Sequence, residues 1–452
     1  MTGKRKGRLA RLRIEKPPQL VALGFAAVIG VVALLLSLPL ATESGKGTPL
    51  LAALFTATSA VCVTGLIVVD TPVYFSTFGE LVVLSGIQAG GLGIMTLSSL
   101  LGLLVFRRLG LRNRMTAAAE TKALGIGDIR RVLRSVIGFS AFFEGVAAVV
   151  LTLRWLTTYD EPFGRAAYLG IFHAVSAFNN AGFALFTDNM IGFRDDPVIS
   201  LTLCVAVIAG GIGFPVLYEL RRELRTPRRW TVHTRITVWT TVVLLVLGTS
   251  AVTAIEWTNP NTLGELGVAG KLLVGFFLGV MPRTAGFNSI DYADAEPATL
   301  FVTDILMFIG GSSAGTAGGI KVTTFALLAF VIYAEARGSS EVHVGGRSLP
   351  REVQRLAVTI ALLGVGLVAG GTLLLLVLTG LPLDVVLFEV TSAFATVGLS
   401  TGITADLPGA GQLLLIALMF IGRLGPVTLA SALALRSRPK LYRLPEERPI
   451  VG

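Results

Sequence analysis

The chain of 452 residues is 53% hydrophobic and only 15% charged, whereas an ordinary soluble domain has roughly 25% charged residues. This composition excludes a soluble enzyme and a disordered chain. The formal charge of +10 would suit nucleic-acid binding, so the positions of the basic residues must decide, and the 52 glycines exceed the roughly 7% of average usage. Cys62 and Cys204 lie in apolar surroundings and the three histidines are isolated, so neither a metal hydrolase nor a thiol enzyme is indicated.

Apolar stretches long enough to cross the roughly 30 Å of bilayer hydrocarbon, about 20 helical residues each, occur eight times. They cover residues 18–38, 79–106, 132–156, 197–220, 231–257, 298–335, 353–379 and 409–435. The first has the basic flank of a signal peptide, but its length and the lack of a clear cleavage pattern favour a retained helix. We therefore expect an all-α polytopic membrane protein with eight transmembrane helices.

The basic residues gather on one side of these spans. Thirty of the 38 lie in the N-terminal tail, in the 107–134, 221–235 and 337–355 connections, and in the tail after residue 435. The opposite connections carry several acids, among them Asp160. By the positive-inside rule, both termini are expected to be cytoplasmic, in a multi-pass protein of the cell inner membrane. The high charge then reflects topology and attraction to anionic membrane lipids, and no nucleic acid is expected as a partner.

The four connections on the other side share a pattern centred on one glycine. These glycines are Gly65, Gly182, Gly286 and Gly398, separated by 117, 104 and 112 residues. Three loops have Ser-Ala starting six residues before the glycine, and a short apolar stretch of half-membrane length precedes each loop. Irregular backbone at membrane depth must be buried in protein or line a cavity. The pattern predicts four membrane–pore-loop–membrane units in a pseudo-four-fold array around one pore.

The four loops are expected to form a potassium selectivity filter. None carries a carboxylate, which excludes an acidic ring for sodium or calcium, whereas rings of backbone carbonyls suit K⁺. Glycine allows the left-handed backbone that turns successive carbonyls toward an axis. The predicted filter residues are Cys62, Val63, Thr64, Gly65, Asn179, Asn180, Ala181, Gly182, Arg283, Thr284, Ala285, Gly286, Ala395, Thr396, Val397 and Gly398. The transported K⁺ is expected at Val63, Thr64, Asn180, Ala181, Thr284, Ala285, Thr396 and Val397.

Two alternatives bear on these loops. The Arg283 side chain would obstruct a cation path, so we expect it to brace the loop from behind while its carbonyl faces the axis. The glycines could instead merely permit close helix packing, but four aligned copies at similar spacing favour the filter.

A second aligned glycine set follows each filter glycine and predicts four helix breaks: Gly90-Gly91, Gly210-Gly211, Gly310-Gly311 and Gly422-Arg423. An arginine at this depth costs about 2.5–3.5 kcal/mol, so a functional positive charge below the filter is favoured over a structural salt bridge. The third unit cannot continue as a regular helix and predicts an intramembrane gate loop. The predicted gate residues are Gly310, Gly311, Ser312, Ser313, Ala314, Gly315, Thr316, Ala317, Gly318, Gly319, Lys321 and Arg423.

Taken together, these motifs resemble the membrane subunit of the Trk/Ktr/HKT potassium transporter superfamily, specifically the Ktr type. The resemblance rests on Val63-Thr64-Gly65, Phe178–Phe183, Arg283–Asn288, Ala395–Ser400 and the Gly310–Lys321 loop. It implies K⁺ uptake with or without Na⁺, a homodimer, and a cytosolic ring of RCK domains that bind ATP/ADP or NAD. Glycine at all four filter positions supports potassium, and the family's gate corresponds to the Gly310–Lys321 loop and Arg423. No nucleotide-binding fingerprint occurs in this chain, so we expect no nucleotide site in it.

These expectations divide the chain into nine parts. The four pore units cover residues 18–106, 132–221, 231–337 (with the gate loop 310–321) and 352–435; the cytoplasmic tails and loops cover 1–17, 107–131, 222–230, 338–351 and 436–452. An intramembrane enzyme is not expected, because no nucleophile and base converge. An alternating-access cation symporter remains as the alternative, although inverted repeats, which would favour it, are not apparent.

Overall fold

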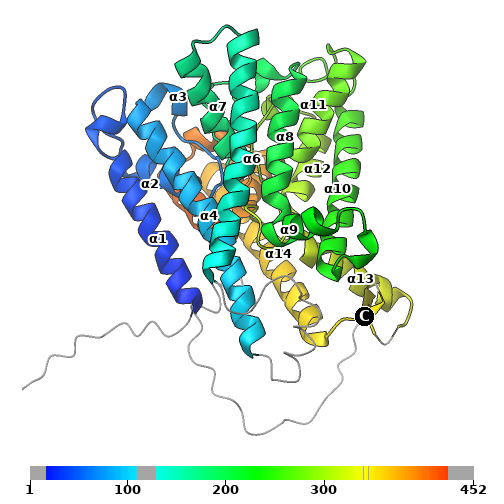
Figure 1. Cartoon of the computed structure of the whole chain (residues 1–452). Helices are drawn as coiled ribbons and strands as arrows, with labels where there is room; N and C mark the ends of the chain where they lie inside the picture. The colour runs from blue at the N-terminus through cyan, green and yellow to red at the C-terminus, as the bar shows by residue number, and fades with distance from the viewer. Residues whose placement is uncertain (1–16, 109–128, 340, 345, 426–452) are drawn as a thin grey trace, which may run out of the picture.

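The computed structural model describes residues 17–108, 129–339, 341–344 and 346–425. These residues are mostly helical, and the long helices run between two ends of the molecule (Figure 1). The helices are α1 (Pro17–Leu36), α2 (Leu50–Val61), α3 (Thr71–Tyr74), α4 (Thr77–Arg108), α6 (Ile129–Thr158), α7 (Phe163–Phe178), α8 (Pro197–Ile212), α9 (Phe214–Glu223), α10 (Val232–Glu256), α11 (Val268–Val280), α12 (Pro297–Phe308), α13 (Val322–Ala336), α14 (Arg351–Thr379), α15 (Leu383–Ala395) and α16 (Gly409–Leu424).

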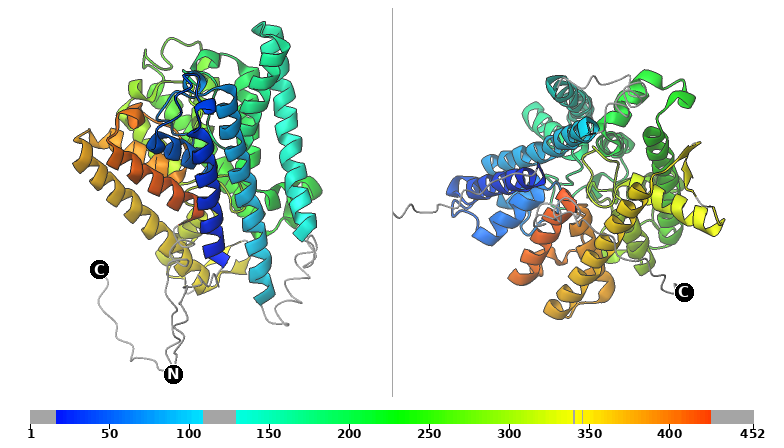
Figure 2. Two further views of the ribbon diagram at one scale, coloured as in Figure 1. Left: turned by 90° about the vertical axis from the view of Figure 1, so that its left-hand side faces the viewer. Right: turned by 90° about the horizontal axis from the view of Figure 1, so that it is seen from below.

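The helices follow one another around a centre in chain order, as the view from below shows (Figure 2). Helix α4 contacts α6 and α7, α8 contacts α11, and α12 contacts α15. Helix α16, near the C-terminal end, returns to pack against α2 near the N-terminal end. The contact between α16 and α2 closes the arrangement into a ring.

Several sequence predictions need correction. The 197–220 stretch divides at Gly213 into α8 and α9, which are bent by 103°, and the 298–335 stretch divides into α12 and α13. Helix α4 runs unbroken through its glycines, so the break expected there is wrong. By length and composition, four described helices could each cross a membrane, or five if the bent pair α8–α9 forms one span. A two-stranded hairpin, β1 (His343–Val344) with β2 (Arg347–Ser348), interrupts the all-α expectation.

Parts of the predicted organisation fall outside the described residues. These parts are nearly all of the N-terminal tail, most of the 107–131 loop, the end of the last predicted span and the C-terminal tail.

The bend between α8 and α9 has a local cause. Gly213 has a φ of +89°, and Pro215 in the first turn of α9 lacks the N–H that would continue α8. In a continuous helix, residue 215 would donate its N–H to the carbonyl of Gly211. That carbonyl instead accepts the N–H of Ser312 at 2.9 Å. The carbonyl of Gly210 likewise accepts the N–H of Thr316 at 3.1 Å. The segment between α12 and α13 therefore completes the end of α8.

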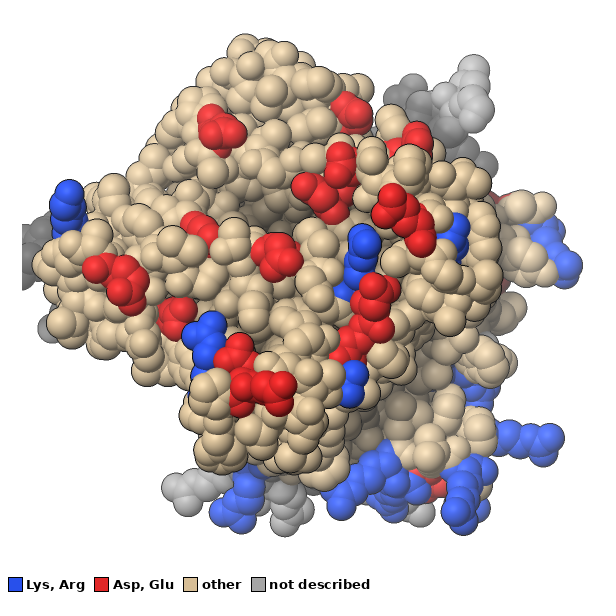
Figure 3. All heavy atoms as spheres, turned by 90° about the horizontal axis from the view of Figure 1, so that it is seen from above, with Lys and Arg blue, Asp and Glu red and all other residues tan. Residues whose placement is uncertain are grey.

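The outer faces of the long helices are apolar, as in a bundle surrounded by lipid. Phe142 of α6, Trp239 of α10 and Val377 of α14 are all exposed. Acidic side chains are scattered over the upper face of the molecule (Figure 3). At the start of α8, Asp196 accepts the N–H groups of Val198 and Ile199, and its carboxylate lies 2.7 Å from Nε of Arg154.

Candidate ion-conduction site

The four glycine-centred loops have the same backbone conformation. Each loop follows a short helix, namely α2, α7, α11 or α15, and each glycine has positive φ: 93° at Gly65, 71° at Gly182, 73° at Gly286 and 98° at Gly398. Two residues earlier, a non-glycine residue is also left-handed in all four loops. These residues are Val63 (φ 56°), Asn180 (61°), Thr284 (80°) and Thr396 (52°). Such angles cost a residue with a side chain about 1–2 kcal/mol, and strain of this kind gathers at functional sites.

The Ser-Ala motif explains how three of the loops are held. The hydroxyl of Ser59 accepts the N–H of Gly65 at 3.0 Å, and the hydroxyl of Ser392 accepts that of Gly398 at 3.0 Å. In the second loop the hydroxyl of Ser176 donates instead to the carbonyl of Phe183 at 2.8 Å. The third loop has valine at this position and no such hydroxyl anchor.

The four glycines close a ring from one loop to the next. A Cβ atom at Gly65 would overlap the carbonyl of Ala181, and one at Gly182 would lie 2.5 Å from the carbonyl of Ala285. A Cβ at Gly286 would overlap the carbonyl of Val397, and one at Gly398 would overlap that of Thr64, which returns to the first loop. We call this arrangement the glycine ring. Any side chain at these four positions would push its neighbouring loop away.

The loop residues that carry these carbonyls are buried, but their carbonyl oxygens accept no hydrogen bond from the described residues. Those predicted to bind K⁺ are each exposed by at most 1%: Val63, Thr64, Asn180, Ala181, Thr284, Ala285, Thr396 and Val397. None of their backbone carbonyls accepts a hydrogen bond from a residue that the structure describes. Buried backbone carbonyls are nearly always paired, so two successive unpaired carbonyls in each of four loops favour a cation as their partner.

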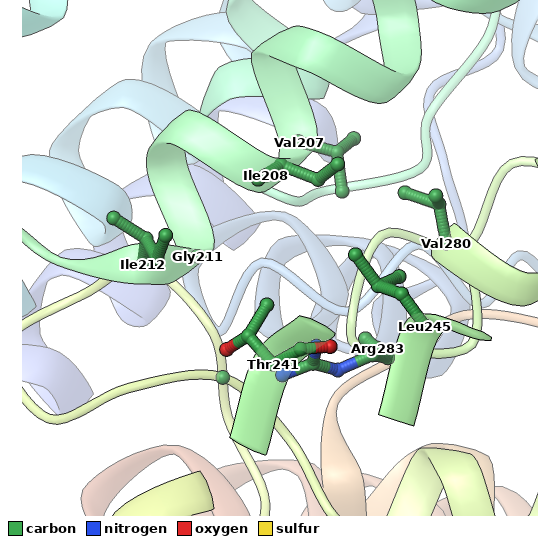
Figure 4. Close-up of a pocket in the computed structure, with 9 residues that line it drawn as sticks. Val207, Ile208, Gly211, Ile212, Thr241, Leu245, Val280 and Arg283 are labelled. Atoms are coloured by element: carbon green, nitrogen blue, oxygen red, sulfur yellow. The ribbon is translucent and has the colours of Figure 1, made fainter. Parts of the chain in front are cut away.

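Arg283 lies behind its loop, as the bracing interpretation expects. Its guanidinium is buried and donates to the carbonyl of Thr241 in α10 and to the carbonyl of Gly310, both at 3.3 Å. The side chain borders a small cavity of about 20 Å³ between α8 and α10, with Ile208 and Leu245 on its walls (Figure 4). The charge therefore faces neighbouring helices and fastens the third loop to the segment below it.

Two features behind the loops were not predicted from the sequence: the direction of the Asn179 side chain, and a polar position nine residues before the filter glycine. The side chain of Asn179 points to α4 and α6, where its amide donates to Gln88 at 2.7 Å and to Glu144 at 3.2 Å. Nine residues before the filter glycine, buried His173 and Glu389 tie their helices to the chain beyond the glycine. His173 Nε2 accepts the N–H of Leu185 at 3.2 Å, and Glu389 accepts the hydroxyls of Ser400 and Thr404. Only the equal spacing from the glycine signals this second position.

Residues 310–321 pass directly beneath the loops. The Gly310 N–H donates to the carbonyl of Ile320 at 2.9 Å, and this bond brings the two ends of the segment together. Between these ends, the hydroxyl of Thr316 lies 2.9 Å from the amide of Asn180 in the second loop. A Cβ at Gly310 would lie 3.3 Å from the methyl of Thr284, and one at Gly318 would lie 2.7 Å from the carbonyl of Ala395. The segment therefore touches the second, third and fourth loops.

Arg423 joins this segment to the first unit. The buried guanidinium donates to the carbonyl of Thr316 in the segment and, at 3.3 Å, to the carbonyl of Gly90 in α4. In the part of the chain that the structure describes, no carboxylate lies within ion-pair distance of Arg423. The contacts therefore do not support the salt-bridge alternative for this arginine.

The other members of the second glycine set allow close helix packing. Cβ atoms at Gly90, Gly210 and Gly422 would overlap the carbonyls of Val61, Phe178 and Phe394, respectively. Each of these carbonyls stands four residues before a filter glycine. Close packing, the alternative considered from the sequence for the loop glycines, thus accounts for these three.

The described residues hold no group of three or more His, Cys, Asp or Glu side chains that could bind a metal. In this stretch of the chain, the oxygen atoms that the loops offer are backbone carbonyls and, at Thr64 and Thr396, buried hydroxyls without a hydrogen-bond partner.

The long apolar helices of the fold are those of a multi-pass membrane protein. A family model described as a cation transport protein (TrkH) matches residues 22–440, and the chain belongs to this family, which consists of transporters rather than enzymes. The chain is 38% identical over 436 residues to the Ktr system potassium uptake protein B of Bacillus subtilis, covering 96% of this chain and 97% of that protein. This similarity confirms the resemblance to the Ktr type predicted from the sequence.

Two further comparisons extend this result. The chain is 32% identical over 453 residues to the potassium/sodium uptake protein NtpJ of Enterococcus hirae, covering 98% of this chain and all of that protein. The crystal structure of the potassium transporter TrkH from Vibrio parahaemolyticus superposes with a TM-score of 0.74 at 19% identity, covering 95% of this chain and 87% of that one. The superposition establishes a shared fold.

Proposed function

We propose that this chain takes up K⁺ through the glycine ring, with the paired carbonyls of the four loops replacing the hydration shell of the ion. The observation that carries the proposal is the closed ring, in which each loop offers two buried carbonyls without a donor. Carbonyl dipoles of this kind favour a weakly hydrated cation. Two similar proteins are named potassium uptake proteins, which supports K⁺ as the transported ion.

In this proposal the eight predicted spans form four units around one pore, with α2, α7, α11 and α15 as half-membrane helices. The C-terminal end of each half-helix points toward its loop and supplies partial negative charge, which stabilises a cation there. The acidic upper face is the outside of the cell and both termini are cytoplasmic, in the inner membrane.

The 310–321 segment and Arg423 act as the gate in this scheme. The segment lies under three loops, and the arginine places a positive charge on the same path. Displacing the segment requires the bonds from Arg423 to Thr316 and from Thr316 to Gly210 to break. Gating then corresponds to a change between an ordered and a displaced segment.

Further features are carried over from the relatives. The name Ktr system protein B implies a second component. From the resemblance to the Ktr type, we propose that this component is a cytosolic RCK-type ring that binds ATP/ADP or NAD as regulator, and that this chain forms a homodimer. Dependence on Na⁺ is proposed from the similarity to a potassium/sodium uptake protein.

The test is ion flux through the purified chain in liposomes. K⁺ uptake down an imposed gradient, exceeding Na⁺ uptake and saturating with K⁺, is the expected result. Flux that requires an opposing or accompanying ion gradient in strict stoichiometry would favour the alternating-access symporter instead. Absence of cation flux from folded protein, with and without the co-purified regulatory component, would overturn the proposal.

A further inference from the structure

A large groove lies away from the glycine ring, between α6 and α9. Its volume is about 1010 Å³, at the upper end of the roughly 300–1,000 Å³ of small-molecule pockets. Phe139, Phe142 and Phe143 of α6 form one wall, and Tyr218 of α9 lies opposite them. Figure 1 shows α9 beside the lower part of α6. No residue of the proposed filter or gate lines this groove.

The walls of the groove are aromatic and partly open to the membrane. The Phe139 ring packs edge-on against Phe214 at 5.5 Å between centroids, and Phe142 packs edge-on against Phe143 at 5.4 Å. The Phe142 side chain is 63% exposed. In a multi-pass protein such a surface on α6 meets hydrocarbon, so it is suited to an acyl chain.

The α9 side of the groove is positively charged. Arg221 and Arg222 both line it and are exposed. The guanidinium carbon of Arg221 lies 6.0 Å from the Phe139 ring centroid, and no carboxylate among the described residues pairs with it. Arg222 has only a 3.9 Å contact with Glu223, whose other oxygen accepts the Thr226 hydroxyl at 2.6 Å. Much of this positive charge is available to an anionic ligand.

Helix α9 is held firmly in this position. At its start Gly213 fixes the bend, and in its middle Glu219 accepts the N–H of Thr231 at 2.6 Å and the hydroxyl of Thr234. At its end, Trp230 donates to the carbonyl of Glu223 at 2.9 Å. The groove is therefore formed before any ligand binds, which lowers the entropic cost of binding.

We propose that this groove binds an anionic membrane phospholipid, with an acyl chain between the α6 phenylalanines and Tyr218 and the phosphate on Arg221 and Arg222. The combination of a long apolar wall and two adjacent guanidinium groups matches a phospholipid with a net negative charge, since arginine recognises phosphate by paired hydrogen bonds and no ammonium group of the lipid offsets the attraction. A free phosphate would leave the aromatic wall uncovered, and a zwitterionic lipid would bring its own ammonium group close to the arginines.

Two variants separate lipid binding from general surface charge. Gly138 lines the groove, and a Cβ built there meets no atom within 4 Å, so Gly138→Leu fills the groove without a clash. Gly145, one heptad further along α6, is equally open but lies outside the groove, so Gly145→Leu is the matched control. Arg221→Gln/Arg222→Gln removes the phosphate ligands, and Arg225→Gln/Arg228→Gln removes the same charge outside the groove.

The measurement is native mass spectrometry of the detergent-purified full chain titrated with phosphatidylglycerol or phosphatidylcholine. An ion pair at an exposed site contributes up to about fivefold in affinity, so Arg221→Gln/Arg222→Gln should weaken phosphatidylglycerol binding by up to about 25-fold. Gly138→Leu should also lose the bound lipid, while both controls retain it. Neither inorganic phosphate nor phosphatidylcholine should displace the bound lipid.

Equal phosphatidylglycerol binding by wild type, the double arginine variant and Gly138→Leu would overturn the proposal. Equal loss in Arg225→Gln/Arg228→Gln would also overturn it, because binding would then follow total charge rather than the groove. Displacement by inorganic phosphate would assign the site to a free anion. None of these readings depends on ion flux, so the proposal stands or falls separately from the transport function.

Discussion

Replacement of Arg423 by alanine tests the proposed gate most directly. Of the two carbonyls that the guanidinium reaches, Gly90 belongs to α4 and Thr316 to the 310–321 segment, so only the bond to Thr316 depends on where the segment lies. A hydrogen bond to a charged group contributes about 1.5–3 kcal/mol. Since every 1.4 kcal/mol is a tenfold change in an equilibrium constant, Arg423→Ala should favour the displaced segment by about 10- to 140-fold.

The assay is the initial rate of ⁸⁶Rb⁺ uptake per molecule in liposomes. The uptake rate of Arg423→Ala should exceed that of the wild type by up to the same factor of about 10- to 140-fold. The increase should be smaller if most wild-type molecules already have the segment displaced. Arg423→Lys, which keeps the positive charge and one donor group, should give a smaller rise. Equal or lower flux from Arg423→Ala, in protein that elutes as a single species with wild-type helicity, would refute the gating argument and leave Arg423 a packing residue.

Three further outcomes are expected. Gly65→Ser places a side chain at a φ of +93° and against the neighbouring loop, so it should lower K⁺ over Na⁺ selectivity in competing flux; an unchanged ratio would count against the filter assignment. Ser392→Ala removes the hydroxyl that holds the fourth loop and should cost about 1 kcal/mol, seen as a lower melting temperature, whereas unaltered melting and flux would contradict the anchoring role. The pKa of Asp196 lies below its usual range, because burial, which raises it, is outweighed by hydrogen bonds from Arg154 and the backbone of α8. The ionised Asp196 carboxylate therefore contributes stability above the ordinary aspartate pKa of about 3.9, and this contribution is lost as the pH falls through the lowered pKa. The melting temperature of the wild type should then fall more steeply with acidification than that of Asp196→Asn. Melting temperatures that fall in parallel for the two proteins would contradict this role of Asp196.

The glycine pattern carries much structural information in this sequence. The left-handed backbone predicted for the four glycines is present, and at each of them a side chain would also strike the next loop. The left-handed residues two positions earlier could not be predicted. Val63 and Thr396 are β-branched and disfavour positive φ, so only the surrounding contacts hold them there.

The helix break at Gly213 shows where glycine alone misleads. Gly90-Gly91-Leu92-Gly93 and Gly210-Gly211-Ile212-Gly213 have almost the same sequence, yet only the second breaks. The difference is Pro215, together with the 310–321 segment, which supplies N–H groups to the freed carbonyls. Proline was visible in the sequence, whereas donors about a hundred residues away were not.

Side-chain partners were the least predictable part of the site. Asn179 was expected in the filter lining, but its side chain bonds Gln88 and Glu144 on two other helices. These partners lie 91 and 35 residues away in the chain, and no local pattern relates them. The position of Arg283 could be anticipated because a cation path excludes a guanidinium, which is an argument from charge rather than from sequence spacing.

The glycine ring is built from one chain, and this has a genetic consequence. In a channel made of four identical subunits, every substitution is repeated four times, so a filter changes all at once or not at all. Here the equivalent places already hold three residue types, threonine at 64, alanine at 181 and 285, and valine at 397, each beside a different neighbour. A single codon therefore alters one quadrant and leaves three intact, so under the proposed function ion preference can be adjusted in quarter steps while the ring stays closed.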